Sequence, residues 1–356
     1  MFSNKNQIKN RTTYCMHKIA IATVIGFCTV LIACSSGTSS STPASSITYA
    51  YVGDFSPNLW QCQINISGQF TSGCTALQNS PIPFKTTISA TFATFGGVNY
   101  AYVNDSTSNL WQCPVNALGQ FTTGCTALTN SPNFNTTRTV TFNTFNNTTY
   151  AYISDLSSNL WRCPINNSTG RFLGSCTALT NSTTPFITTI ATTFATFNGT
   201  TYVYVSDSGT NLWQCPMDAN GGFSSGCIAL ANATVPGFTS NRTASFNTFG
   251  GITYAYVGDF SANIWQCPMN ATGGFSSGCT ALSSNTVPGF NQTRSATFAN
   301  FGGTTYTYVG DASKTIWQCP INTSTGQFSG SCTPLTNSTA PGFTSALIAT
   351  FYQLQF

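Results

Sequence analysis

The sequence predicts an all-β protein, a six-bladed β-propeller of four-stranded blades. One unit recurs six times along the 356 residues, and the six tryptophans that mark it lie 50 to 52 residues apart. Fixed-period self-similarity of this length is typical of repeat architectures. The repeats open at a second strand, Thr48–Val52, and finish on a first strand, Leu347–Phe351. The last strand can therefore complete the first blade and close a ring without a long exposed edge.

Each repeat is expected to contain four short strands bounded by Gly, Asn, Asp or Pro turn signals. In the fifth repeat the expected strands are Arg242–Phe249, Thr253–Val257, Asn263–Cys267 and Gly274–Cys279. The second strand is apolar on both faces, as expected for a sheet packed between two neighbours. One blade cannot bury both of its faces, so the repeats are needed together.

The N-terminus has the layout of an export signal. Lys18 is followed by an uncharged, mostly apolar run, Ile19–Ala33, which is too short to span a bilayer comfortably. The run ends in Leu31-Ile32-Ala33-Cys34, which resembles the lipobox of bacterial lipoproteins and implies lipid attachment at Cys34. Residues 1–33 are thus expected to be a signal peptide; an uncleaved anchor is the alternative, and Met16 is an alternative start.

Three segments follow from this interpretation: the signal 1–33, a lipidated Ser-rich tether 34–46 and the propeller 47–356. By analogy with bacterial lipoproteins, Ser35 after the cysteine indicates the outer membrane or periplasm. The signal removes the only histidine, His17, and leaves seven Lys or Arg against seven Asp. This neutral composition predicts no nucleic-acid partner.

The segment Tyr102-Val103-Asn104-Asp105 and its counterparts resemble YVTN-type β-propeller repeats, a group similar to lactonase-like propellers. The resemblance covers nearly all of Thr48–Phe356. Propellers of this group often have seven blades, whereas this chain has six repeats. The offset between its two ends favours a closed ring of six.

Residue pairs suited to two-residue type I′ turns join the first and second strands, as Gly250-Gly251 does. The register that they set places Asp54, Asp105 and Asp207 opposite Leu347, Ile88 and Ile190. It also predicts three structural cross-strand pairs of opposite charge: Arg138 with Asp155, Arg242 with Asp259, and Arg294 with Asp311.

Twelve cysteines remain after the signal and Cys34 are set aside, two in each repeat. In an exported protein this pairing predicts one disulfide per blade, with metal thiolates or free thiols as alternatives. Hairpin counting places the partners out of opposition, so a bulge or an irregular fourth strand is expected. The predicted pairs are Cys62 with Cys74, Cys113 with Cys125, Cys163 with Cys176, Cys215 with Cys227, Cys267 with Cys279, and Cys319 with Cys332.

Two repeated residue types are candidates for binding. The aspartates that end each second strand either cap the following loop or form a shared ligand or metal site; they are Asp54, Asp105, Asp155, Asp207, Asp259 and Asp311. The tryptophans either fill the core between blades or offer stacking platforms for sugars; they are Trp60, Trp111, Trp161, Trp213, Trp265 and Trp317. We expect the structural role for both sets, and no metal or cofactor.

Composition argues against familiar catalytic machinery. The chain has no Glu, no His beyond the signal, and only one further acid, Asp218; acid–base and nucleophilic catalysis usually need such groups in pairs. The sequence therefore predicts a monomeric, non-enzymatic binding or scaffolding module at the bacterial cell envelope, with a protein or a cell-surface glycan as its partner. The alternatives are a multivalent lectin-like propeller and a lactonase-like hydrolase, the latter needing Asp and Asn ligands round the central channel.

Overall fold

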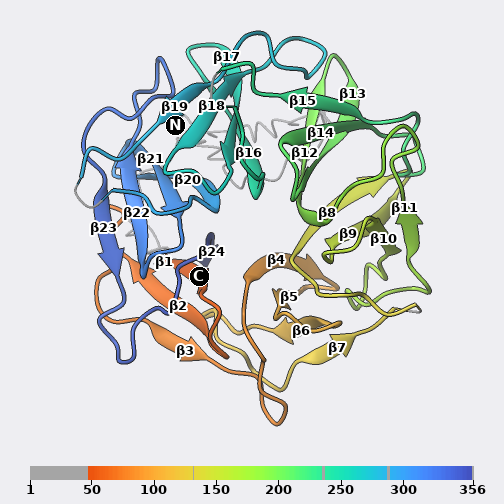
Figure 1. Cartoon of the computed structure of the whole chain (residues 1–356). Helices are drawn as coiled ribbons and strands as arrows, with labels where there is room; N and C mark the ends of the chain where they lie inside the picture. Colours follow the sequence, from red (N-terminus) through yellow and green to blue (C-terminus); the bar gives the residue numbers. More distant parts are fainter. Residues whose placement is uncertain (1–46, 131, 235–236, 287–288, 355–356) are drawn as a thin grey trace, which may run out of the picture.

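The computed structural model describes residues 47–130, 132–234, 237–286 and 289–354, and within them the chain forms a ring of six antiparallel, four-stranded sheets (Figure 1). The predicted signal 1–33, the tether 34–46 and Cys34 lie outside these residues. No helix in the described ranges has the length and hydropathy needed to cross a membrane. The predicted six-bladed propeller is thus confirmed.

In each blade the four strands lie side by side, with the first strand next to the central channel and the fourth at the outside (Figure 1). Their bounds, blade by blade, are β24 (Ile348–Leu354), β1 (Ile47–Gly53), β2 (Leu59–Ile64) and β3 (Thr75–Leu77); β4 (Ser89–Phe95), β5 (Val98–Asn104), β6 (Leu110–Pro114) and β7 (Thr126–Leu128); β8 (Thr139–Phe145), β9 (Thr148–Ser154), β10 (Leu160–Pro164) and β11 (Thr177–Leu179); β12 (Thr189–Phe197), β13 (Thr200–Asp207), β14 (Asn211–Pro216) and β15 (Ile228–Ala231); β16 (Thr243–Phe249), β17 (Ile252–Gly258), β18 (Ile264–Pro268) and β19 (Thr280–Leu282); β20 (Ser295–Phe301), β21 (Thr304–Gly310), β22 (Thr315–Pro320) and β23 (Thr333–Thr336).

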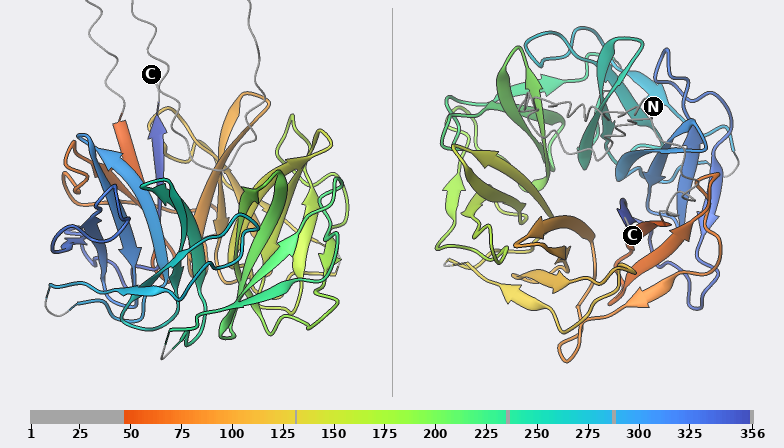
Figure 2. Two further views of the ribbon diagram at one scale, coloured as in Figure 1. Left: turned by 90° about the horizontal axis from the view of Figure 1, so that it is seen from above. Right: turned by 180° about the vertical axis from the view of Figure 1, so that it is seen from behind.

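Ring closure joins the last strand to the first. β24 pairs antiparallel with β1 along its whole length, from Ile47 opposite Leu354 to Gly53 opposite Ile348. In the side view the start of β1 and the end of β24 lie together at one face of the ring (Figure 2). The expected exchange of strands between the two ends of the domain is confirmed.

The hairpins between the first and second strands confirm the expected turns. Asn146 and Asn147 both have positive φ, 44° and 60°, as the two central residues of a type I′ turn require. Their register agrees with the prediction except in the fourth blade. There Thr189, not Ile190, lies opposite Asp207, because the ladder shifts between Thr189 and Ala191. This bulge adds one residue that turn counting cannot detect.

The fourth strands differ from the prediction. Gly274–Cys279 was expected to be a strand, but β19 begins only after Cys279, and before it a single bridge joins Met269 to Phe275. The residues between bridge and strand are the irregularity that hairpin counting required. The same correction applies to every blade, where the second cysteine of the pair lies directly before the fourth strand and not in it: Cys74, Cys125, Cys176, Cys227, Cys279 and Cys332.

The predicted pairing of the cysteines is confirmed, one disulfide per blade. The irregular segment brings Cys267 opposite Cys279, with Cα atoms 4.2 Å apart. The alternatives of metal thiolates and free thiols are therefore excluded for these twelve residues. The six disulfides join Cys62 to Cys74, Cys113 to Cys125, Cys163 to Cys176, Cys215 to Cys227, Cys267 to Cys279, and Cys319 to Cys332.

The core lies between blades. One cluster combines Trp265 with Tyr204 and Leu212 of the preceding blade, and the other five follow the same pattern. The buried tyrosine of each second strand also donates a hydrogen bond to a glycine carbonyl of the next blade, including Tyr308 to Gly68 across the ring closure at 2.8 Å. Burial raises the pKa of these tyrosines, so they remain protonated donors.

Candidate functional site

The ring aspartates are structural. All six are at most 1% exposed, and five accept the indole N–H of their own blade's tryptophan at 2.8–2.9 Å. Asp259 illustrates the pattern: Oδ2 accepts from Trp265 and from the backbone of Thr239, while Oδ1 accepts from the backbone of Ser261. In the second blade the described donors to Asp105 are loop groups, and the indole N–H of Trp111 has no partner among the residues that the structure describes. The carboxylates cap their loops, as expected.

The tryptophans lie inside the interblade core. Their exposed fractions range from 2% to 7%, and each ring packs edge-on against a phenylalanine, as Trp265 does against Phe238 with centroids 6.2 Å apart. These rings offer no open face on which a sugar could stack. The geometry therefore gives no support to a lectin site built from the six tryptophans.

The three predicted Arg–Asp ion pairs do not form. The ladder places Thr243 opposite Gly258, so Arg242 and Asp259 are neighbours across it as expected. However, no described residue forms an ion pair or hydrogen bond with the guanidinium groups of Arg138, Arg242 or Arg294, and their buried Nε atoms have no partner. The reason is that the aspartates are already satisfied by indole and backbone N–H groups.

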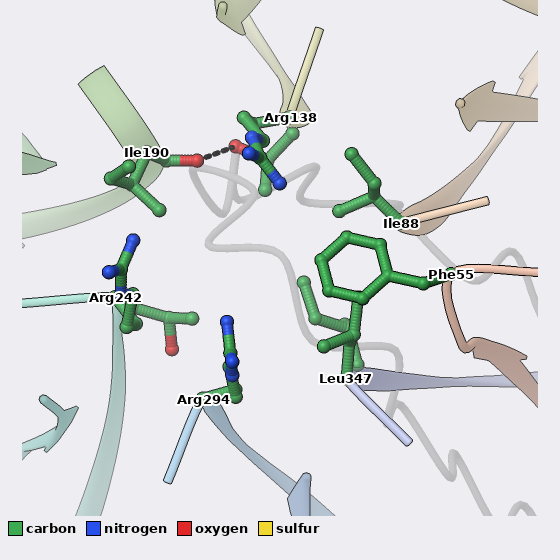
Figure 3. A pocket seen from close by; sticks show the side chains of 10 residues that line it. Phe55, Ile88, Arg138, Ile190, Arg242, Arg294 and Leu347 are labelled. Carbon is green, nitrogen blue, oxygen red and sulfur yellow. Dashed lines mark hydrogen bonds between the residues drawn. The ribbon is translucent and has the colours of Figure 1, made fainter. Parts of the chain in front are cut away.

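The three arginines instead converge at one mouth of the central channel (Figure 3). Arg138, Arg242 and Arg294 directly precede β8, β16 and β20, the innermost strands of their blades. The corresponding positions of the other three blades are aliphatic: Ile88, Ile190 and Leu347. The six equivalent positions therefore form a ring of three cationic and three aliphatic side chains around the mouth of the channel.

This mouth has two chemically different sides. It encloses a cavity of about 40 Å³. Figure 3 shows the three guanidinium groups on one side and Phe55, Ile88 and Leu347 on the other. Phe55 is in the loop after β1 and has φ 62°, a left-handed conformation shared by Phe260 at the equivalent position of the fifth blade. This loop backbone places an aromatic ring beside the channel.

No described residue forms an ion pair with the three arginines of the mouth, although the charge of Asp311 partly offsets the effect of burial on the pKa of Arg294. Burial lowers the pKa of Arg138, Arg242 and Arg294, and for Arg242 burial and the charges of the other two lower the pKa to about 10. With its pKa at about 10, Arg242 remains positively charged at neutral pH, and guanidinium groups in proteins generally stay protonated at that pH. The ring of Phe260 gives partial compensation, because its centroid lies 3.5 Å from the Cζ atom of Arg242 and 4.5 Å from that of Arg294.

Sequence reasoning identified these arginines but assigned them the wrong role. Aligning the six repeats places Arg138, Arg242 and Arg294 in one ring position, so the signal for a shared site was present. The ion-pair interpretation failed because the sequence does not show that each aspartate is used by tryptophan. Within the described ranges no three His, Cys, Asp or Glu side chains gather as metal ligands.

Comparisons with known proteins agree with the fold. No protein-family model and no curated protein sequence matches the chain. Among solved structures it is similar to a periplasmic gluconolactonase, PpgL, from Pseudomonas aeruginosa, with 11% identity, a TM-score of 0.52 and coverage of 87% of this chain and 100% of that one. A protein of unknown function from Bacteroides caccae gives 14% identity, a TM-score of 0.50 and coverage of 88% and 100%.

These comparisons correct the expectation that the protein is not an enzyme. That expectation rested on missing acid–base pairs, yet a gluconolactonase shares this propeller architecture over its full length. Electrostatic stabilisation of a transition state by fixed donors needs no histidine or glutamate.

Proposed function

We propose that the protein is a hydrolase that acts on a small lactone or ester at the three-arginine mouth. The observation that carries this proposal is the convergence of Arg138, Arg242 and Arg294 on one cavity, where no described residue forms an ion pair or hydrogen bond with their guanidinium groups. The propeller architecture shared with a gluconolactonase supports it. The acid that such a reaction releases is an anion, which this cavity is suited to hold.

The reaction develops negative charge where the guanidinium groups can meet it. Water adds to the carbonyl carbon and loses one proton to the solvent, and the carbonyl oxygen becomes an oxyanion. The C–O bond to the ring oxygen then breaks, that oxygen takes up the second proton of the added water, and the carbonyl group becomes a carboxylate. Fixed donors aimed at such an oxyanion are typically worth 10²–10³-fold in rate each. Arg242 and Arg294, which share the ring of Phe260, are the pair best held for this role.

Turnover is tested with the purified full chain and a panel of lactones and aryl esters, with acid release followed by pH-stat. Arg242→Met and Arg294→Met should each lower kcat/KM by about 10²-fold. Lys314→Met is the matched control, because it removes one positive charge from an exposed side chain in the loop after β21, outside the cavity. Folded protein without turnover of any substrate, or equal losses in all three variants, would refute the proposal.

We also propose that the protein is exported and anchored by lipid at Cys34. The six disulfides support an oxidising compartment. The end of β1, Gly53, lies opposite Ile348, which lines the arginine mouth, so β1 starts at the other face of the ring. A tether at this start would direct the mouth away from the membrane. Cys34→Ala should move the protein from the membrane fraction to the soluble fraction, and unchanged membrane association would contradict the anchor.

A further inference from the structure

We infer that the three-arginine mouth binds the carboxylate of a small acid with a short alkyl end, and that it discriminates against polyhydroxylated acids. The inference rests on the proposed function, because such an acid is the product of hydrolysing an alkyl-substituted lactone. It deepens that proposal by naming the ligand class. It also concerns binding alone, so it can be tested without turnover.

The guanidinium groups on the cationic side of the mouth have no acceptor in the ranges that the structure describes. The Nε atoms of Arg138, Arg242 and Arg294 are buried and have no hydrogen-bond partner among the described residues. A buried donor without a partner costs free energy, and hydrogen bonds from guanidinium groups to carboxylates are among the strongest in proteins. An anionic acceptor in the cavity would remove this cost from several donors at once.

The size of the cavity limits what can enter it. The cavity has a volume of about 40 Å³ and is open to solvent on one side. This size suits a compact anionic group such as a carboxylate better than a sugar ring. The carboxylate therefore enters, and the remainder of the acid lies in the opening beside the apolar side of the mouth.

The apolar side offers that remainder no polar side chain and no unused backbone N–H group among Phe55, Ile88 and Leu347. Phe55, Ile88 and Leu347 have no side-chain donors or acceptors, and each of their backbone N–H groups already donates to a carbonyl, those of Thr87, Asn104 and Gly53 respectively. Hydroxyl groups placed against this wall would lose water without replacement, which is unfavourable. An alkyl chain has no polar group to desolvate, and removing its apolar surface from water is favourable.

The equivalent position in another blade shows which substitution of Phe55 the loop can accept. Ser106 in the second blade is at the position equivalent to Phe55 and has nearly the same φ, 60° against 62°. Phe55→Ser therefore keeps a side chain that this loop conformation accommodates. It removes the largest apolar group of the wall while all three arginines remain.

Isothermal titration of the full chain at pH 7 and low salt, with sodium hexanoate, sodium gluconate and inorganic phosphate, tests the inference. Hexanoate should bind at least tenfold more tightly than gluconate or phosphate. Arg242→Met should weaken hexanoate binding at least tenfold, and Lys314→Met should not change it. Phe55→Ser should weaken the binding of hexanoate and leave that of gluconate unchanged, so the ratio of the two affinities should become smaller.

The outcomes separate this inference from the proposed hydrolysis. Hexanoate binding that depends on Arg242, without turnover of any lactone or ester, would support the binding site and refute the hydrolase. Turnover that depends on Arg242 with equal affinity for hexanoate and gluconate, or with phosphate as the tightest ligand, would overturn the inference and leave the hydrolase standing. Undetectable hexanoate binding to folded wild-type protein would also overturn it.

Discussion

The hydrogen bond from tryptophan to aspartate gives a stability prediction with an internal control. Trp265 donates to Asp259 at 2.9 Å, whereas the indole N–H of the equivalent Trp111 has no partner in the described part of the chain. Both rings are buried and pack edge-on against a phenylalanine, with centroids 6.2 and 6.1 Å apart. Replacement by phenylalanine therefore removes the same ring volume in both blades and breaks a hydrogen bond in only one.

The expected difference follows from that one bond. A hydrogen bond to a charged group contributes about 1.5–3 kcal/mol, so Trp265→Phe should lower the free energy of unfolding by about that much more than Trp111→Phe does. Loss of the unpartnered N–H in Trp111→Phe should enlarge the gap. Urea unfolding followed by far-UV circular dichroism, with the disulfides intact, measures both variants at unchanged m-value.

Equal destabilisation by the two variants would refute this reasoning. The indole N–H would then add nothing to the stability of the loop after the second strand. The carboxylate of Asp259 would also no longer be explained as a structural acceptor, and the ring of aspartates would return as a candidate for chemistry.

Three further predictions concern cross-linking, ring closure and charge. Cys267→Ala with Cys279→Ala should lower the free energy of unfolding by about 3 kcal/mol in the chain-entropy estimate, measured by the same urea unfolding. Gly310→Ala should lower the melting temperature more than Gly258→Ala, because its new Cβ would lie 2.1 Å from a backbone oxygen of the next blade, against 3.4 Å; equal melting shifts would contradict the packing at ring closure. Hexanoate affinity should be flat from pH 6 to 9 and fall above about 10, where Arg242 loses its proton; titration calorimetry at several pH values measures this, and Arg242→Met should abolish the fall.

The fold could be predicted from the sequence because each repeat supplies the same local signals. Paired turn residues such as Asn146-Asn147 fix the inner hairpins, and both adopt the positive φ that the predicted turn requires. The offset of the chain ends then determines how the ring closes. Local signals did not predict the bulge at Ile190, which adds a residue to the ladder. They also overestimated the length of the fourth strands, which the disulfide and the preceding turn shorten.

The site was harder to predict than the fold. Register alone correctly placed Arg242 across from Asp259. Register does not show which donors bind the carboxylate. The indole N–H of Trp265 and the backbone N–H of Thr239 donate to it, and the guanidinium group of Arg242 does not. The destination of the guanidinium group depends on the curvature of the ring, which brings residues about fifty positions apart to one mouth (Figure 3).

Comparison of the six blades indicates that the three arginines bind a ligand and are not needed for the fold. Ile88 and Leu347 occupy the same ring position as Arg242, so the blade does not need a cation there. Replacing buried charges by apolar groups is often neutral or stabilising. The stacking on Phe260 explains at most two of the three arginines, since Arg138 has no such ring contact among the described residues. Three of only seven Lys or Arg beyond the first 33 residues thus gather, at a cost in stability, where a bound anion would offset that cost.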